Sequence, residues 1–182
     1  MKFFRKGLEE SITLPAPPVD DIAEAEEVKV IVANRSAKDV KSVMDHDRVP
    51  FYAIRVYCQE NGLVFHDNEF EDIIEQARPV IKHFKYKFNR RRPIEIISTL
   101  NTLPSSTNKT PSYPSGHSTQ SRLVAKYVAG KFPEHEKEII KKGNECGYGR
   151  VQAGFHYPTD NEIGNLLGEK MYFMMNKANY EQ

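Results

Sequence analysis

Three short groups of residues carry side chains that can bind an anion and move protons. In chain order they are Lys85 with Arg92-Pro93, then Pro114-Ser115-Gly116-His117, then Arg150 with His156 and Asp160. Each group falls at the end of a stretch whose pattern predicts a helix. Together they supply cations, a hydroxyl donor, two imidazoles and a carboxylate, which are the parts needed to hold an oxyanion and attack it.

The second group, Pro114 to His117, closes a turn-rich loop and is predicted to open a helix. The first turn of a helix presents unpaired N–H groups and partial positive charge, which suit an oxyanion. Ser115 adds a hydroxyl donor, and Gly116 lets an anion approach the backbone closely. His117 then projects from the first turn toward the bound group. An ordinary N-cap followed by a surface histidine would give the same pattern.

Lys85 and Arg92 are seven residues apart. Because two helical turns span about 7.2 residues, we expect both side chains on one face of a helix that Pro93 ends. Two cations on one face repel unless they share an anion, and a guanidinium beside an ammonium suits phosphate. Arg90 and Arg91 are expected to point elsewhere, solvated or paired. A basic helix C-terminus without a ligand is the alternative interpretation.

His156 and Asp160 are four residues apart, with Pro158 between them. If Pro158 opens a helix, Asp160 can reach back and accept a hydrogen bond from one imidazole nitrogen of His156. The other nitrogen then keeps its lone pair, which makes the histidine a nucleophile or a base. Arg150, one to two turns upstream, can aim its guanidinium at the same point. A buried structural hydrogen bond is the alternative here.

The elements that would position these groups are all predicted as helices. Apolar spacings of three and four, with capping residues and proline breaks, indicate helices over about 21–35, from 37 to a break at Pro50, and over 51–60, 68–92, 117–132, 134–153 and 158–177. Asn68 with Glu71 resembles a capping box. Residues 98–116 are the longest irregular stretch, and such loops are often functional.

This pattern predicts an all-α fold, because no run alternates as a strand would. Residues 1–19, which include the sequence LPAPP, are expected to form an extended N-terminal arm. Residues 20–182 are expected to form a single helical domain. Aromatic residues near the end, such as Tyr172, Phe173 and Tyr180, fit either the core or the interface of a homo-oligomer.

Composition excludes several classes of protein. The 26 lysines and arginines nearly balance 25 aspartates and glutamates, which gives no support to a nucleic-acid binder. No apolar stretch approaches the roughly 20 residues of a membrane helix, so no integral membrane segment is expected. The two cysteines, Cys58 and Cys146, are too few for a disulfide scaffold or a thiolate metal site, and we expect them to be buried or idle.

In their order and spacing, the three groups resemble the motifs of the type 2 phosphatidic acid phosphatase superfamily. They stand here as KYKFNRRRP at 85–93, PSGH at 114–117 and GRVQAGFHYPTD at 149–160. Three ordered matches are highly specific. The resemblance extends over 85–168, about half of the chain. It implies a helical bundle like that of acid phosphatases and vanadium haloperoxidases, with the site between helix ends.

The resemblance implies a metal-independent phosphomonoester hydrolase that works through a phosphohistidine. Carried onto this sequence, His156 is the nucleophile, Asp160 orients it, and His117 is the general acid and then the general base. The implied phosphate-binding residues are Lys85, Arg92, Ser115, Gly116 and Arg150. No cofactor and no metal is implied, the partner is a small phosphoester, and vanadate is expected to inhibit as a phosphate mimic. An acid-shifted pH optimum follows, because His117 must be protonated while His156 is neutral.

The LPAPP arm and the SYPSGHS context resemble the soluble branch, the class A bacterial non-specific acid phosphatases. Those proteins carry an export leader, and here no apolar core follows the basic start before Glu9. As the sequence stands we expect a cytoplasmic protein, or a periplasmic or secreted one if a leader was removed. Gly149 replaces the serine that usually precedes the arginine of the third motif, and we expect a modest loss of activity from this.

Two other functions use the same residues. A vanadate-dependent haloperoxidase would bind vanadate where phosphate sits, although those enzymes are generally much longer and have extra helices. A non-catalytic phosphate-binding module would bind anions without turnover, and the departure at Gly149 is its support.

Overall fold

The computed structural model describes residues 2–175, and over that range the chain is helical with no strand. The α-helices are α1 (Ile22–Asn34), α2 (Ala37–His46), α3 (Tyr52–Glu60), α4 (Asp67–Phe88), α5 (Pro93–Ile96), α6 (Gly116–Lys131), α7 (Glu136–Gln152) and α8 (Pro158–Phe173). Two 3₁₀ turns, η1 (Leu8–Ser11) and η2 (Pro133–His135), complete the elements. The all-α prediction is confirmed.

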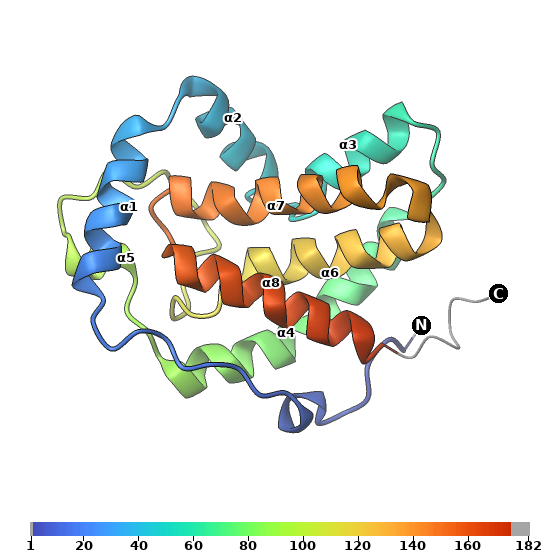
Figure 1. The fold of residues 1–182 in the computed structure, drawn as a ribbon, viewed down its shortest axis with the longest axis horizontal. Helices are drawn as coiled ribbons and strands as arrows, with labels where there is room; N and C mark the ends of the chain where they lie inside the picture. The colour runs from blue at the N-terminus through green and yellow to red at the C-terminus, as the bar shows by residue number, and fades with distance from the viewer. Residues whose placement is uncertain (1, 176–182) are drawn as a thin grey trace.

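Helix α6 is central and packs against both α7 and α8, while α4 crosses it and α1, α2 and α3 pack on α7 (Figure 1). The start of α6, the end of α7 and the start of α8 lie at one end of the molecule, beside α1 and α5 (Figure 1). Two of the three predicted groups stand on these helix ends. The packing of the bundle therefore brings together residues that are distant in sequence.

Glycines on α8 allow its close approach to α6. A Cβ atom at Gly164 would lie 2.6 Å from the Ser115 carbonyl oxygen, and one at Gly168 would lie 2.6 Å from the Thr119 carbonyl oxygen. Any larger residue at either position would push the two helices apart, since real Cβ atoms essentially never come within 3.0 Å of another heavy atom. These contacts fix the start of α8 beside the start of α6.

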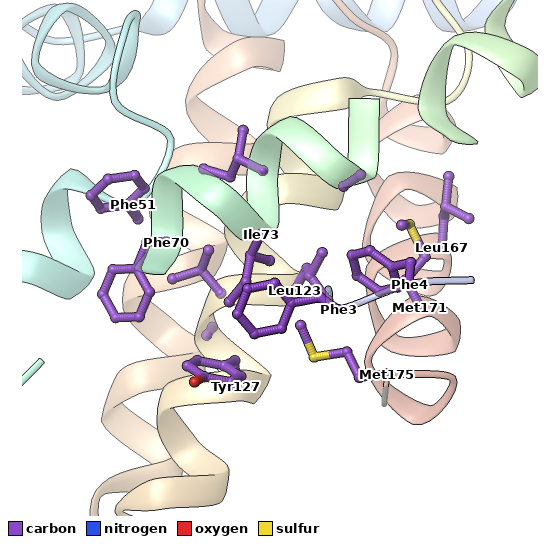
Figure 2. Close-up of a cluster of buried hydrophobic side chains, with 14 of the residues drawn as sticks. Phe3, Phe4, Phe51, Phe70, Ile73, Leu123, Tyr127, Leu167, Met171 and Met175 are labelled. Atoms are coloured by element: carbon purple, nitrogen blue, oxygen red, sulfur yellow. The ribbon is translucent and has the colours of Figure 1, made fainter. Parts of the chain in front are cut away.

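The main hydrophobic core lies between α4, α6, α8 and the N-terminal segment (Figure 2). Phe3 and Phe4 of that segment lie in the same cluster as Ile73, Leu123, Met171 of α8 and Met175 just after it. Figure 2 labels Phe3, Phe4, Phe51, Phe70, Ile73, Leu123, Tyr127, Leu167, Met171 and Met175. Burying side chains of this size contributes about 1.5–3 kcal/mol each, so the core fixes α4, α6 and α8 relative to one another.

The N-terminal residues 2–19 run along the bundle, with Leu8, Ile12 and Leu14 in the core. Near the LPAPP sequence, the Tyr113 hydroxyl donates to the Pro15 carbonyl. The segment therefore contacts the loop that precedes α6. Residues 176–182, the end of the expected domain, lie outside the described residues, and so does Tyr180. Of the other two aromatic residues, Tyr172 packs against the core and Phe173 is exposed.

Two expectations about the longest helix are wrong. Helix α4 begins at Asp67 with His66 as its N-cap and no side-chain cap, so Asn68 and Glu71 do not form a capping box. The helix ends at Phe88, where Asn89 adopts a left-handed conformation with φ 48°. Asn tolerates this conformation better than most residues, and it turns the chain before the proline is reached. Pro93 starts α5, because a proline is well suited to a first helical position.

Cys58 and Cys146 are both buried free thiols, as expected. Burial raises the pKa of both thiols. The buried thiols are therefore unreactive at neutral pH. Among residues 2–175, no helix combines the length and the apolar composition that crossing a bilayer requires.

Candidate active site

The PSGH group opens α6 as the sequence predicted. Ser115 is the N-cap, and its Oγ accepts hydrogen bonds from the Ser118 N–H (3.3 Å) and the Ser118 hydroxyl (2.8 Å). The Ser115 N–H donates to the Asp160 carbonyl at 2.9 Å, which joins the start of α6 to the start of α8. A Cβ atom on Gly116 would lie 3.6 Å from the Lys85 Cε, so the lysine side chain passes close to the helix start.

Lys85 and Arg92 do not share a helical face, which corrects the sequence prediction. Lys85 is in the last turn of α4, and Arg92 lies beyond the turn at Asn89, as the N-cap of α5. The two side chains still converge, because the carbonyl groups of three consecutive loop residues, 110–112, accept hydrogen bonds from both of them. The turn at Asn89 therefore brings Arg92 near Lys85, which two turns of a single helix were expected to do.

Carbonyl groups of the loop before α6 hold both cations. Lys85 Nζ donates to the Pro111 carbonyl (2.6 Å) and the Ser112 carbonyl (3.1 Å), and Arg92 Nε donates to the Thr110 carbonyl (2.9 Å). Burial, with Arg92 next, lowers the pKa of Lys85 to about 7. Burial also lowers the pKa of Arg92 to about 10, so the guanidinium stays charged at neutral pH. The predicted functional loop thus orients two of the predicted phosphate ligands.

His156 and Asp160 form the expected pair at the start of α8. Pro158 is the first residue of that helix, and His156 Nδ1 lies 3.1 Å from Asp160 Oδ2. His156 Nε2 lies 3.5 Å from the Arg92 Nη1. Burial and then the charge of Arg92 hold the pKa of His156 well below its ordinary value. The imidazole is therefore neutral, with Nδ1–H directed at the carboxylate and the Nε2 lone pair facing the guanidinium.

Two residues that the sequence analysis did not assign to the site contact Asp160. The Ser112 hydroxyl donates a very short hydrogen bond to Asp160 Oδ2 and lies 3.3 Å from His156 Nδ1. Arg90 Nη1 donates to Asp160 Oδ1 at 2.8 Å. Arg90 was expected to be solvated or paired, and it is paired and almost fully buried. Nothing in the run of three arginines distinguishes Arg90 from Arg91, so the sequence carried no signal for it.

Arg150, in the last turn of α7, forms an ion pair with Asp47, a residue that no motif singled out. Its Nη1 donates to Asp47 Oδ1 at 2.8 Å, and its Nη2 donates to the Thr107 hydroxyl at 2.9 Å. Its guanidinium stacks on Phe155, 4.5 Å from the ring centroid. The Nε of Arg150 is buried and has no partner among the described residues, which leaves one donor for an anion.

His117 lies at the wall of the site, half-buried in the first turn of α6. Its Nε2 is 2.9 Å from the Asp47 carbonyl oxygen, so Nε2 carries the proton and donates it. Burial and the charge of Arg150 lower the pKa of His117 below its ordinary value. The Asp47 backbone therefore orients this imidazole, while the Asp47 carboxylate orients Arg150.

Gly149 lies inside α7, and its N–H belongs to a helix interior where it is used by the helix itself. The Gly149 N–H therefore cannot donate to a bound phosphate in place of the hydroxyl of the missing serine. A Cβ atom there would meet the Val43 Cγ2 at 3.4 Å, an ordinary contact. The hydroxyl groups nearest to Arg150 instead come from Ser105 and Thr107 of the loop.

A cavity of about 410 Å³ opens beside His117 and Lys85, and its lining does not include His156, Arg92 or Arg150. Lys85, Thr107, Gly116 and His117 line its inner part, with Asp47 beside them. The outer part has apolar walls from α4 and the segment after α2, and charged residues of both signs. The apolar residues are Val49, Pro50, Phe51, Ile74 and Ile81, and the charged ones are Arg48, Arg78, Lys82, Glu71 and Glu75. Arg78 is paired with Glu75 at 2.9 Å.

The described part of the chain contains no group of three or more His, Cys, Asp or Glu side chains arranged to hold a metal ion. The site that the structure brings together is instead rich in cations. After burial, the largest causes that lower the pKa of His156 are the positive charges of Arg92, Lys85 and Arg150. Such an arrangement suits an anion with several oxygens.

Comparison with known proteins finds bacterial acid phosphatases among the relatives. The chain is 33% identical over 87 residues to a non-specific acid phosphatase of Salmonella typhi, covering 46% of this chain and 35% of the relative. It is 33% identical over 86 residues to a non-specific acid phosphatase of Providencia stuartii, again covering 46% and 35%. The match thus spans little more than a third of the length of these relatives.

A transmembrane PAP2-type phosphatidylglycerolphosphate phosphatase from Bacillus subtilis has a similar fold. Its TM-score is 0.58 at 20% identity, over 84% of this chain and 82% of that one. The family model of the PAP2 superfamily matches residues 75–181, which include all three groups of site residues. The chain therefore belongs to the PAP2 superfamily.

Proposed function

We propose that this protein is a metal-independent phosphomonoester hydrolase that acts through a phosphohistidine at His156. One observation carries the proposal: a buried imidazole has its Nδ1 against a carboxylate, at 3.1 Å, and its Nε2 beside a guanidinium, at 3.5 Å. A neutral histidine held in this way has a nucleophilic lone pair directed to the place where Arg92 would hold a phosphoryl oxygen. The homology to acid phosphatases supports the same activity.

In the first step, Nε2 of His156 attacks phosphorus. The new P–N bond forms as the P–O bond to the leaving group breaks, and the leaving oxygen takes a proton from His117. Asp160 stabilises the positive charge that develops on His156. In the second step, water attacks phosphorus, the P–N bond breaks, and His117 accepts the proton of the water. Lys85, Arg92 and Arg150, with Ser115 and the Gly116 N–H, stabilise the charge on the three phosphoryl oxygens.

Because the pKa of His117 is lowered, the ring is neutral in the free protein and must obtain from another group the proton that it gives to the leaving oxygen. Phosphomonoesters have a second pKa of about 6, so the monoanion carries a proton of its own into the site. A neutral His117 can accept that proton and pass it to the leaving oxygen. Activity therefore falls as the pH rises above the second pKa of the substrate, which keeps the optimum acid-shifted.

The cavity supports a small phosphoester as the substrate. Its apolar walls fit an aromatic or aliphatic leaving group. Substrates with such a leaving group are expected to have the lowest KM in a panel of phosphoesters.

The test is such a panel, assayed from pH 4 to 8 with a chelator present. We expect turnover that survives the chelator, and a phosphohistidine that can be trapped by rapid quenching. His156→Ala should abolish both, while His83→Ala, an exposed histidine on α4, should leave both intact. Turnover by His156→Ala at the wild-type rate would contradict the assignment of the nucleophile. Anion binding without turnover would favour the phosphate-binding module, and bromide oxidation after vanadate addition would favour the haloperoxidase.

A further inference from the structure

Arg90 lies at the centre of a buried cluster of carboxylates that includes Asp160. Its Nη1 donates to Asp160 Oδ1 (2.8 Å), its Nε to Asp21 Oδ1 (2.8 Å) and its Nη2 to Glu24 Oε2 (2.6 Å). Its guanidinium stacks on Tyr157, 3.8 Å from the ring centroid. The side chain is only 2% exposed. Each nitrogen of the guanidinium thus donates to a carboxylate, and these three hydrogen bonds fix the position of the cation.

The arrangement fixes one oxygen of Asp160 and leaves the other for the histidine. Oδ1 accepts from Arg90, while Oδ2 accepts from His156, from Ser112 and from the Tyr157 N–H at 3.1 Å. Because the carboxylate is planar, holding Oδ1 sets the angle at which Oδ2 meets Nδ1 of His156. Loss of the Arg90 fork would free the carboxylate to rotate.

The two other carboxylates belong to α1, far from the three motifs in sequence. Glu24 accepts from Arg90 and also from the Thr159 N–H (3.0 Å) and the Thr159 hydroxyl (2.7 Å), in the first turn of α8. Asp21 is the N-cap residue of α1. Helix α1 is thus joined through Arg90 and Thr159 to the helix start that carries Asp160.

We propose that Arg90, held by Asp21 and Glu24 of α1, is a positioning residue that fixes the carboxylate of Asp160 and, through it, the Nδ1–H tautomer of His156. As a statement about catalysis, this inference rests on the proposed phosphatase function. As a statement about the tautomer of His156, it can be tested without any turnover.

The charge of Arg90 also supports its role as a positioning residue for Asp160. The charged or titratable groups around Asp160 are Arg90, Lys85, Arg92, His156, Tyr113 and Tyr157. Burial raises the pKa of Asp160, and the charge of Arg90 is the largest influence opposing this. Without that charge the pKa of Asp160 would rise further, so its carboxylate would become protonated at a higher pH.

The first experiment compares Arg90→Lys and Arg90→Gln with Arg91→Gln, a matched change at the exposed neighbour. Arg90→Lys keeps the charge but loses the fork, and we expect kcat to fall about 10- to 100-fold, the range seen for residues that orient a reactive side chain, with little change in KM. Arg90→Gln also loses the charge, so the acid limb of its pH profile should move to higher pH. Arg91→Gln should change neither quantity.

The second experiment reads the histidine directly, in protein with ¹⁵N-labelled imidazoles. Wild type should show His156 as the Nδ1–H tautomer, and Arg90→Gln should show a mixture of tautomers. If Arg90→Gln is too unstable to study, Glu24→Gln is the substitute, since it removes one carboxylate of the cluster and leaves Arg90 in place. Its control is Glu27→Gln on the exposed face of α1. Glu24→Gln should give a smaller shift in tautomer population than Arg90→Lys.

The outcomes separate the two proposals. A wild type with no phosphatase turnover but with a tautomer that depends on Arg90 would overturn the proposed function and support the positioning role. Wild-type kcat, an unmoved acid limb and an unchanged tautomer in both Arg90 variants would overturn the positioning role, while turnover in the same assays would support the function.

Discussion

The two histidines of the site are held in different ways. His156, buried at the start of α8, faces the carboxylate of Asp160, which is itself paired with Arg90. His117, half-buried at the start of α6, faces only the backbone carbonyl of Asp47, whose carboxylate is paired with Arg150. In both cases an arginine neutralises an aspartate, but the ring of His156 is within hydrogen-bond distance of its aspartate's carboxylate, whereas that of His117 is within hydrogen-bond distance of the backbone carbonyl.

This difference matches the roles proposed for the two rings. A phosphohistidine carries positive charge that must be stabilised until water arrives, and an adjacent carboxylate provides this. An acid that must release its proton and recover it is better served by the partial charge of a carbonyl, which orients the ring through Nε2–H and raises the basicity of Nδ1 less than a carboxylate would. The following changes test that comparison, from the largest expected effect to the smallest.

Asp160→Asn should be the most damaging change among the partners of the two histidines. An amide can donate to Nδ1 of His156, which would move the ring proton to Nε2 and remove the nucleophilic lone pair, at a cost of about 10⁴ in kcat. Asp47→Asn keeps the carbonyl that orients His117, and should cost about 10-fold through its effect on Arg150. Steady-state kinetics with an aryl phosphate measure both. Equal losses in the two variants would contradict the comparison.

His117→Ala should have an effect that depends on the leaving group. General acid catalysis contributes about 10²–10⁴ in rate, and most of this should be lost for alkyl phosphates, whose leaving oxygen needs a proton. Activated aryl phosphates should still form the phosphohistidine, which should then accumulate because water lacks its base. Quenched-flow trapping measures this accumulation. An equal loss for alkyl and aryl substrates, with no trapped intermediate, would reverse the assignment.

The affinity for inorganic phosphate should depend on the charge of Lys85, which acts on both histidines. The pKa of Lys85 in the free protein is lowered to about 7, so the side chain loses its charge above this pH and a bound anion must restore it. Relative to Lys85→Arg, which stays charged, wild type should therefore lose roughly five-fold in affinity between pH 7 and 8.

Isothermal titration in two buffers should also detect proton uptake on phosphate binding by wild type at pH 8. The control is Lys87→Arg, at an exposed position on the same helix, which should behave as wild type does. Parallel pH dependence in wild type and Lys85→Arg would show that Lys85 is charged throughout.

Gly149→Ser, on the His117 side of the site, should have the smallest effect. Serine is more favourable than glycine inside a helix by about 0.5 kcal/mol, and the nearest atom to its Cβ, on Val43, is at an ordinary distance of 3.4 Å. We expect a small rise in Tm and a change in kcat below about three-fold, since the loop hydroxyls already contact Arg150. Gly164→Ala is the contrasting change, because its Cβ would clash with α6 and lower the Tm. A large gain in kcat for Gly149→Ser would show that the missing serine limits this protein.

Local interactions account for what could be predicted about the site. The start of α6 at PSGH and the pairing of His156 with Asp160 around Pro158 both depend on residues within one or two helical turns. The placement of Lys85 and Arg92 on one helical face was predicted by the same reasoning and is wrong. The left-handed turn at Asn89 breaks the helix between them, and sequence spacing alone does not reveal such a turn.

The amino-acid sequence by itself determined the all-α fold, the three groups of site residues and the family, because helix periodicity and motif spacing are local properties of the chain. Only the tertiary structure decided which charges meet. Asp47 reaches Arg150, and Asp21 and Glu24 reach Arg90, across separations of 66 to 103 residues. Those pairings follow from how α1, α2 and α8 pack on α6 and α7, and the packing depends on the whole core rather than on any segment.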